Sequence, residues 1–263
     1  MLRKRLIAVV TIRNHWAVQS FGFQRYLPLG KPECIIENLD RWGADEILIQ
    51  DISRSQSGAG PNMELIEKIR QLHCSTPLTY AGGIDSAASA IAAVQGGVER
   101  IAIDQLLHQN PDQVYDIAAA LGSQAVVASI PLGIGADQSI QWYDYKHNRY
   151  RAMSEPVLGL LADNVISEAI VIDHVNEGRA NSFQFTLLDY FANIQVPLIA
   201  FGGLSECRQL EKALLDTRVA AVAMGNVLNY REHQLQHYKQ QLSAISAMPV
   251  RSAHYQRTYW YAS

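Results

Sequence analysis

The 263-residue sequence has little cysteine, no long apolar run and no excess of either charge. Its cysteines, Cys34, Cys74 and Cys207, lie far apart without CxxC spacing, which argues against a disulfide framework or a zinc site and is typical of a reducing compartment. No uncharged apolar stretch reaches the ~18 residues of a membrane helix, and the apolar run between Arg5 and Arg13 has no cleavage signal. The 22 basic and 25 acidic residues balance to a formal charge of -3, so neither nucleic acid nor a membrane is expected as a partner. These absences predict a cytoplasmic protein.

What is present is the composition of a globular domain, with 48% hydrophobic and 18% charged residues. The length fits one α/β barrel of roughly 250 residues. We therefore predict a single domain over residues 1–245, followed by a tail over 246–263. This tail contains four aromatic residues, namely Tyr255, Tyr259, Trp260 and Tyr261. If exposed, these rings form a patch for a partner protein; if packed on the barrel, they form a lid.

Eight short apolar runs predict β-strands, and an amphipathic segment with helical periodicity follows each of them. We expect strands at residues 5–12, 46–51, 77–81, 100–104, 124–131, 168–174, 197–201 and 219–224. We expect helices at residues 33–43, 61–73, 85–97, 110–121, 153–165, 184–193, 205–216 and 229–244. An open doubly wound sheet alternates in the same way, so this order alone does not decide between it and a (β/α)8 TIM barrel.

Internal repetition favours the barrel. Residues 77–86, which contain Gly82-Gly83, return as residues 197–206, which contain Gly202-Gly203. Two further strand segments repeat at a similar spacing, namely residues 5–12 with 124–131 and 46–51 with 168–173. Three consecutive units that repeat after about half the chain predict an α/β fold, a (β/α)8 TIM barrel built from two duplicated half-barrels.

Each half carries a glycine pair where a strand ends and a helix begins, Gly82-Gly83 in the first half and Gly202-Gly203 in the second. Glycine permits close backbone approach, and free N–H groups at a helix start attract an anion. Gly225-Asn226 completes the second phosphate cradle, because the loops after strands seven and eight commonly share one phosphate. Asp104 stands at the matching place of the first half, where a carboxylate repels phosphate unless it is protonated or bridged. The pattern predicts a substrate with two phosphates, or with one if a site has been lost.

Four predicted strands begin with an ionisable residue, namely Arg5, Glu46, Arg100 and Glu168. Strand alternation puts these side chains in one register, so they form a ring of two cations and two anions if they face inward. Such a ring either plugs the N-terminal end of the barrel or gates an interior passage. Charge pairing alone favours the plug.

Several segments together resemble the cyclase subunit of imidazole glycerol phosphate synthase over about residues 1–244. They are Lys4–Ala8, Gly43–Glu46, Gln50–Ile52, Gly82–Ile84, Gly122–Val127, Pro197–Ala200, Gly202–Gly203 and Tyr230–Glu232. The resemblance implies a bisphosphorylated ribonucleotide across the C-terminal face and a partner glutaminase at the opposite end, whose ammonia passes through the barrel. It also implies that the ring of four charges is the family's gate, with Arg100 where a lysine is usual.

The same resemblance shows where this chain departs from the family. The two catalytic aspartates of the family fall at Thr11 and Pro131, and neither side chain transfers protons near neutral pH, so we expect the standard lyase catalysis to be lost. The usual Asp-Gly after the sixth strand is Glu177-Gly178, with Gly178 expected at the phosphate, and the asparagine of the first phosphate site is Asp104. Whether the chain is an enzyme is therefore open.

Other candidate residues lie at strand ends. Asp173 and His174 can act as an acid–base pair, although a structural histidine fits about as well, and Asp51 can orient a substrate group. No lysine stands at a strand end, which disfavours a Schiff-base aldolase. The histidines lack metal-ligand spacing, so neither a metal nor a cofactor is expected. The aromatic-rich segment 135–152 is either a hairpin over the site or a surface loop.

The residues and the resemblance together predict a barrel that receives ammonia from a glutaminase and passes it to a phosphorylated or nucleotide-linked sugar. The resemblance extends to a variant group linked to amidation of surface polysaccharides, in which such a barrel works with a glutaminase and with a separate synthetase as a third protein. Two alternatives stay open at this point. One is the standard cyclase of histidine biosynthesis, and the other is a non-catalytic scaffold that activates the glutaminase.

Overall fold

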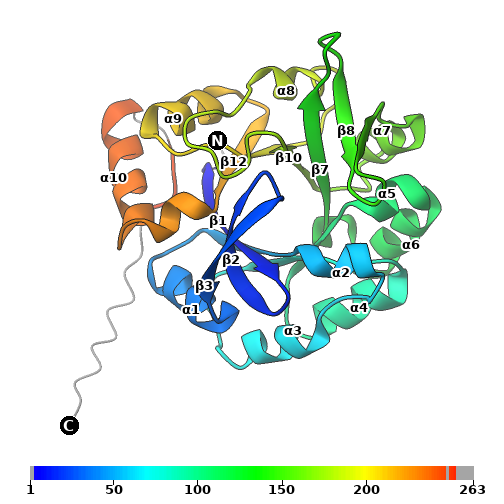
Figure 1. The fold of residues 1–263 in the computed structure, drawn as a ribbon, viewed down its shortest axis with the longest axis horizontal. Coiled ribbons are helices and arrows are strands. Elements are labelled where there is room, and N and C mark those ends of the chain that lie inside the picture. The colour runs from blue at the N-terminus through cyan, green and yellow to red at the C-terminus, as the bar shows by residue number, and fades with distance from the viewer. Residues whose placement is uncertain (1–2, 247–248, 253–263) are drawn as a thin grey trace.

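The computed structural model describes residues 3–246 and 249–252, and these form a closed (β/α)8 barrel (Figure 1). Neighbouring barrel strands are parallel, and the ring closes where β7 pairs with β10. The barrel strands are β1 (Arg5–Arg13), β4 (Glu46–Asp51), β5 (Leu78–Ala81), β6 (Arg100–Ile103), β7 (Val126–Ile134), β10 (Glu168–Asp173), β11 (Leu198–Phe201) and β12 (Val219–Met224). All eight expected strands are present, and their ends differ from the expected ones by at most about three residues, as is usual for such boundaries.

Helices surround the barrel and connect its strands. They are α1 (Pro32–Arg41), α2 (Ile52–Ser57), α3 (Met63–Arg70), α4 (Ala87–Gln95), α5 (Gln105–Gln109), α6 (Pro111–Leu121), α7 (Glu155–Ala162), α8 (Thr186–Asp189), α9 (Cys207–Leu215) and α10 (Gln234–Ser246). The expected helix at 184–193 is reduced to α8, because this segment bonds mostly three residues apart, as in Leu187 to Gln184 and Phe191 to Leu188, which gives tight turns. The short helices α2 and α5 were not expected. Within the described residues, no helix is both long enough and apolar enough to cross a membrane.

Each half of the barrel also carries a hairpin after its first strand. The strands β2 (Trp16–Phe21) and β3 (Arg25–Gly30) follow β1, and β8 (Ile140–Asp144) and β9 (Arg149–Arg151) follow β7. In Figure 1 the β2–β3 hairpin lies over the middle of the ring of strands. Segment 135–152 is thus a hairpin, whereas the β2–β3 hairpin was not expected from the sequence. Because parallel barrels build active sites at the C-terminal ends of their strands, both hairpins lie where they can cover a site.

The apolar core has two layers. One layer lies between the strands and the surrounding helices, and a second one fills the barrel interior. The interior cluster consists of Ile7, Val9, Leu48, Ala81, Ala102, Val127, Ile170, Ile172, Ile199, Phe201, Ala221 and Ala223. Four of its members are alanines, so the interior is lined by small as well as bulky side chains. Phe23 of the β2–β3 turn packs against this cluster.

Candidate active site

The four charged residues at the start of β1, β4, β6 and β10 form one closed ring of ion pairs. Arg5 Nη1 lies 2.9 Å from Glu46 Oε2, and the other terminal nitrogen of Arg5 pairs with Glu168. Arg100 Nη1 lies 3.3 Å from Glu46 Oε1, and Arg100 Nη2 lies 2.7 Å from Glu168 Oε2. The four side chains are 5% to 15% exposed. Each charge therefore has two opposite charges as neighbours, in a setting mostly shielded from water.

Two hydroxyl groups complete the ring. Thr79 Oγ1 donates to Glu46 Oε1 at 2.5 Å, and Arg100 Nη2 donates to Ser167 Oγ at 2.9 Å. Above the ring begins the apolar interior cluster. The ring therefore stands between the N-terminal face and the barrel interior, which is the position that both a plug and a gate require.

Thr11 and Pro131, where the resemblance places a catalytic aspartate pair, carry no titratable group. Thr11 is buried on β1 and pairs with Gln50 of β4 and Val18 of β2. Pro131 lies on β7 opposite Ile172 of β10. A threonine hydroxyl does not titrate near neutral pH, and proline has neither a side-chain donor nor a backbone N–H. Any proton transfer at this face must use other residues.

The carboxyls of Asp51 and Asp173 are occupied by the loops that follow their strands. Asp51 Oδ2 accepts a hydrogen bond from Asn62 Nδ2 at 3.1 Å. Asp173 accepts from the side chain and the backbone amide of Asn176, at 3.0 and 3.1 Å, and from the Gln184 amide at 2.9 Å. Burial raises the pKa of both carboxyls, and these hydrogen bonds act against that rise. The two aspartates thus hold equivalent loops in the two halves.

His174 lies in an aromatic cluster over the barrel interior. Its ring stacks on Tyr143 with the centroids 3.7 Å apart and on Phe23 at 5.7 Å. The Tyr150 hydroxyl lies 3.0 Å from His174 Nδ1, within hydrogen-bond distance. Phe23 contacts the interior cluster as well, so the His174 layer covers the C-terminal end of the barrel. Both hairpins contribute to this layer.

The histidine and the tyrosine of this pair are both uncharged at neutral pH. Burial lowers the pKa of His174 to about 4, and burial raises the pKa of Tyr150 to about 12. A neutral imidazole is the form that accepts a proton, and a phenol hydrogen-bonded to its Nδ1 orients the ring. An anionic ligand bound beside the imidazole favours its charged form and raises its pKa. Without such a ligand, the lowered pKa makes His174 a weak base, so it takes up a proton near neutral pH only if a bound anion raises its pKa.

The low pKa of His174 makes folding stability depend on pH. The unfolded histidine titrates near 6.5, above the folded value of about 4, so the unfolded chain binds more protons between these values. The contribution of His174 is thus fully present above pH 6.5, and about 3 kcal/mol is lost as the pH falls to 4. Urea unfolding of the wild type and of His174→Asn across this range checks the prediction: the difference in unfolding free energy between them changes by that amount. Parallel curves contradict it.

The β2–β3 hairpin is fastened to the second half by residues expected at the phosphate site. Asn226 clamps the backbone of Ser20, because its Oδ1 accepts from Ser20 N at 3.1 Å and its Nδ2 donates to Ser20 O at 2.6 Å. Glu177 Oε2 accepts from Ser20 Oγ at 2.8 Å and from Phe23 N at 3.3 Å. A Cβ at Gly178 would lie 2.0 Å from Ser20 O, so this close approach requires glycine. Asn226 and Gly178 therefore position the hairpin.

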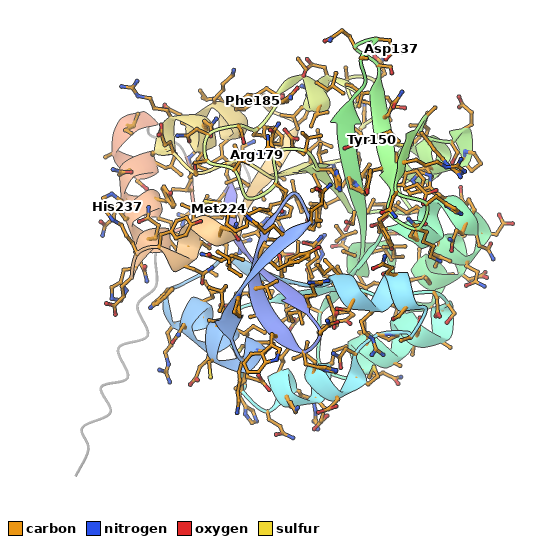
Figure 2. The ribbon with its side chains drawn as sticks, viewed as in Figure 1. Asp137, Tyr150, Arg179, Phe185, Met224 and His237 are labelled. Atoms are coloured by element: carbon orange, nitrogen blue, oxygen red, sulfur yellow. The ribbon has the colours of Figure 1, made fainter. Side chains whose placement is uncertain are left out.

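The second half has a cavity of about 180 Å³. It is lined by three loops, residues 177–180, 201–205 and 223–227, and by Tyr230. Gly202, Gly203 and Gly225 thus come together, as expected from the sequence. The exposed Arg179 also lines this cavity, and Figure 2 shows it on the loop after β10 in the half that carries Met224. The cavity combines glycine-rich backbone with one cation, Arg179, and one buried carboxyl, Glu177, whose pKa is raised by burial. The free backbone and the cation suit an anion of small size.

The glycine pairs of the two halves are packed alike. A Cβ would lie 2.4 Å from Asp51 O at Gly82 and 2.2 Å from Gly60 O at Gly83, and it would lie 2.7 Å from Asp173 O at Gly202. The halves differ at the residue that follows the next barrel strand. Asp104 follows β6, and its Oδ1 is buried without a hydrogen-bond partner among the described residues. Burial raises the pKa of Asp104 well above its ordinary value, and the nearby Asp144 raises it further. The aromatic hairpin β8–β9 lies over this region.

Sequence reasoning did not assign several residues of this face. Phe23 and Ser20 belong to the unexpected hairpin, and Arg179 follows Gly178 in a loop. Tyr143 and Tyr150 lie in the aromatic-rich segment 135–152, whose composition was the available signal. The aromatic tail at 253–263 lies outside the described residues. Among those described, no three histidine, cysteine, aspartate or glutamate side chains gather in a metal-binding group.

Comparison with known proteins gives matches that cover most of the chain. The family model described as "Histidine biosynthesis protein" matches residues 5–234. A Vibrio vulnificus protein, provisionally named imidazole glycerol phosphate synthase subunit hisF2, is 27% identical over 235 residues, which are 89% of this chain and 86% of that protein. The imidazole glycerol phosphate synthase subunit HisF of Hyphomonas neptunium is 25% identical over 256 residues, 96% of this chain and 100% of that protein. The similarity thus extends over nearly the whole chain at low identity.

Proposed function

The chain belongs to the histidine biosynthesis protein family, and within it we propose a HisF-like synthase subunit that passes ammonia from a glutaminase to an acceptor other than the usual ribonucleotide. The observation that carries this proposal is a contrast between the two ends of the barrel. At the N-terminal end, four charges form a closed ring. At the C-terminal end, Thr11 and Pro131 occupy the positions of the family's aspartate pair. The ammonia path is kept while the usual proton-transfer groups are replaced.

The N-terminal face supports a glutaminase partner. The ring is buried enough to exclude bulk water, and its charges compensate one another, so opening it costs the loss of specific ion pairs. Docking of a partner at this face can supply that energy. Ammonia admitted past the ring then has to pass among the aliphatic side chains and alanines that fill the interior, which keep water away from it.

The C-terminal face supports an anionic acceptor and a proton-transfer residue. The cavity of the second half places Arg179 beside glycine-rich loops, which favours a phosphoryl group. Addition of ammonia to an electrophilic carbon leaves a proton on nitrogen that must be removed. His174 stacks on Phe23, which packs against the interior cluster, so His174 is placed to take that proton when the bound anion raises the pKa of its imidazole. In this account the acceptor is a phosphorylated or nucleotide-linked sugar of surface polysaccharide synthesis, and a synthetase acts as a third protein.

The standard cyclase is the runner-up, because relatives bear the name imidazole glycerol phosphate synthase. The purified barrel, given ammonium and the bisphosphorylated ribonucleotide, decides between the two. We expect no imidazole glycerol phosphate above background, since loss of each positioned acid or base costs about 10²–10⁴ in rate. Turnover at an ordinary rate contradicts the proposal.

A second experiment tests the proposed activity directly. The barrel and its glutaminase are incubated with amide-¹⁵N glutamine and the small-molecule extract of the source cells. We expect mass spectrometry to detect a phosphorylated compound that has gained one ¹⁵N atom. If the glutaminase consumes the glutamine and no such compound is formed, the proposal is contradicted, and the non-catalytic scaffold remains as the explanation.

A further inference from the structure

Resting on the proposed function, the geometry points to an acceptor with a single phosphoryl group, which binds at the second-half cradle while the first-half cradle is closed by the protein itself. The second-half cradle is defined by Gly203, Ser205 and Arg179. The first-half cradle is defined by Gly83 and Asp85, which are the repeat equivalents of Gly203 and Ser205, and by Arg54, the arginine of the loop after β4. Because the two halves repeat, their hydrogen-bond donors can be compared position by position.

The backbone amides of the first-half cradle are already satisfied. Gly83 N donates to Ser55 Oγ at 2.8 Å. Asp85 N and Ser86 N both donate to Ser89 Oγ at 3.1 Å. An anion entering this cradle would have to displace two serine hydroxyls from these amides.

The amides at the equivalent positions of the second half are free. Within residues 3–246, the N–H groups of Gly203, Ser205 and Glu206 donate to no protein acceptor. Gln209 stands where the first half has Ser89, so no hydroxyl reaches back to the loop. Free amides at the start of a helix are the donors that a phosphoryl group uses.

The two arginines differ in the same way. Arg54 of the first half donates to the backbone carbonyls of its own loop, with Nε 2.8 Å from Gly60 O and Nη2 2.6 Å from Ala59 O. Arg179 of the second half is exposed, lines the cavity and has no ion pair among the described residues. One guanidinium is thus committed to its loop, and the other is available to a ligand.

The β8–β9 hairpin covers the first-half cradle with aromatic side chains. Trp142 is buried and stacks on His108, with ring centroids 3.6 Å apart. The Tyr145 hydroxyl is buried beside Asp104 and Ser55, so it lies next to the hydroxyl that holds Gly83. These rings take the place that a second phosphoryl group needs.

Charge also opposes a second phosphoryl group. Asp144 on the hairpin is buried and contacts His147 at 2.8 Å and Arg151 at 3.3 Å. Despite burial, hydrogen bonds from His147 hold the pKa of Asp144 below its ordinary value, so this carboxylate is negative beside Asp104. The second half has Gly225 where the first half has Asp104, and a phosphate there meets no carboxylate at that position. The hydrogen bonds, the aromatic rings of the β8–β9 hairpin and the charges therefore all indicate that the first-half cradle is closed and the second-half cradle is open.

Calorimetric titration of the purified barrel with ribose 5-phosphate tests this inference. One working cradle predicts a stoichiometry of one, whereas two working cradles predict a stoichiometry of two. A stoichiometry of two, or no binding of the probe, overturns the inference.

Matched arginine variants locate the site. Arg179→Met is expected to weaken ribose 5-phosphate binding about 10- to 100-fold, since it removes a charge-assisted hydrogen bond. Arg54→Met is expected to leave the affinity unchanged, and thermal melting shows whether both variants remain folded. Equal effects of the two variants, or the reverse order, contradict the assignment. Failure here is distinct from failure of the proposed function, because incorporation of ¹⁵N from glutamine is measured separately.

Discussion

His174→Asn is expected to lower ¹⁵N incorporation from glutamine about 10²–10⁴-fold, which is the usual loss when a positioned acid or base is removed. The reason is that His174 lies in the layer over the barrel interior and is neutral at neutral pH. Asparagine keeps a polar side chain of similar reach but cannot take up a proton. The rate with saturating ammonium is expected to fall equally, because the proton must be removed whatever the source of nitrogen. The measurement is the initial rate by mass spectrometry with each nitrogen source.

His108 supplies a matched control for this experiment. His108 is half-buried, burial lowers its pKa to about 4 as for His174, and it stacks on Trp142 in the first half. It therefore resembles His174 in environment but lies at the closed cradle. His108→Asn is expected to retain most of the activity, and Tyr150→Phe to lose about tenfold, in line with the loss of one hydrogen bond to the imidazole. A His174→Asn protein that is folded and works at the wild-type rate removes this residue from the mechanism.

Reversing the charge at Glu46 is expected to abolish glutamine-dependent product formation and to spare the ammonium-dependent reaction. Glu46 pairs with both Arg5 and Arg100, so Glu46→Lys puts three cations beside Glu168 alone. The ring then opens to water, and ammonia released by the glutaminase escapes and is protonated. Ammonium supplied in excess reaches the C-terminal face directly, without crossing the ring. Initial rates with glutamine and with ammonium measure both effects.

Breaking this ring also affects stability, so the experiment needs a milder variant. Removing one partner from a buried ion pair costs about 3–5 kcal/mol, and Glu46→Lys falls in this range. Glu46→Gln keeps an acceptor for Thr79 and is expected to show the same selective loss in a better-folded protein. Glu64→Gln, which breaks an exposed pair with Lys68, is the control and should change neither rate. If the Glu46 variants lower the rates with glutamine and with ammonium equally, the proposal that ammonia passes through the barrel is contradicted.

The fold follows from the sequence because a barrel repeats a simple pattern. Each strand is a short apolar run, and the duplication after half the chain selects a closed barrel over an open sheet. Strand alternation also gives the inward register, which brings Arg5, Glu46, Arg100 and Glu168 together. Thr11 and Pro131 are located at the ends of their strands by the internal repeat, which aligns residues 5–12 with residues 124–131.

The detail of the cradles could not be predicted in this way, because it depends on side-chain partners from distant loops. Glycine pairs stand in both halves, yet Ser89 occupies the amides of one and Gln209 leaves those of the other free. The sequence predicts Asn226 as a phosphate ligand. In the structure, its side-chain amide instead forms hydrogen bonds with the backbone of Ser20, which is distant in sequence. Whether such a group binds a ligand or a protein loop is evident only when the positions of the hairpins are known.

The most direct test of the account follows the origin of the transferred nitrogen. The complex of barrel and glutaminase receives unlabelled glutamine in a solution of ¹⁵N ammonium, together with the acceptor-containing extract. We predict that the product of the wild type carries the unlabelled glutamine nitrogen, and that Glu46→Gln shifts it toward the ¹⁵N of the solution. A wild-type product labelled in proportion to the ammonium present would show that the nitrogen passes through water and not through the barrel.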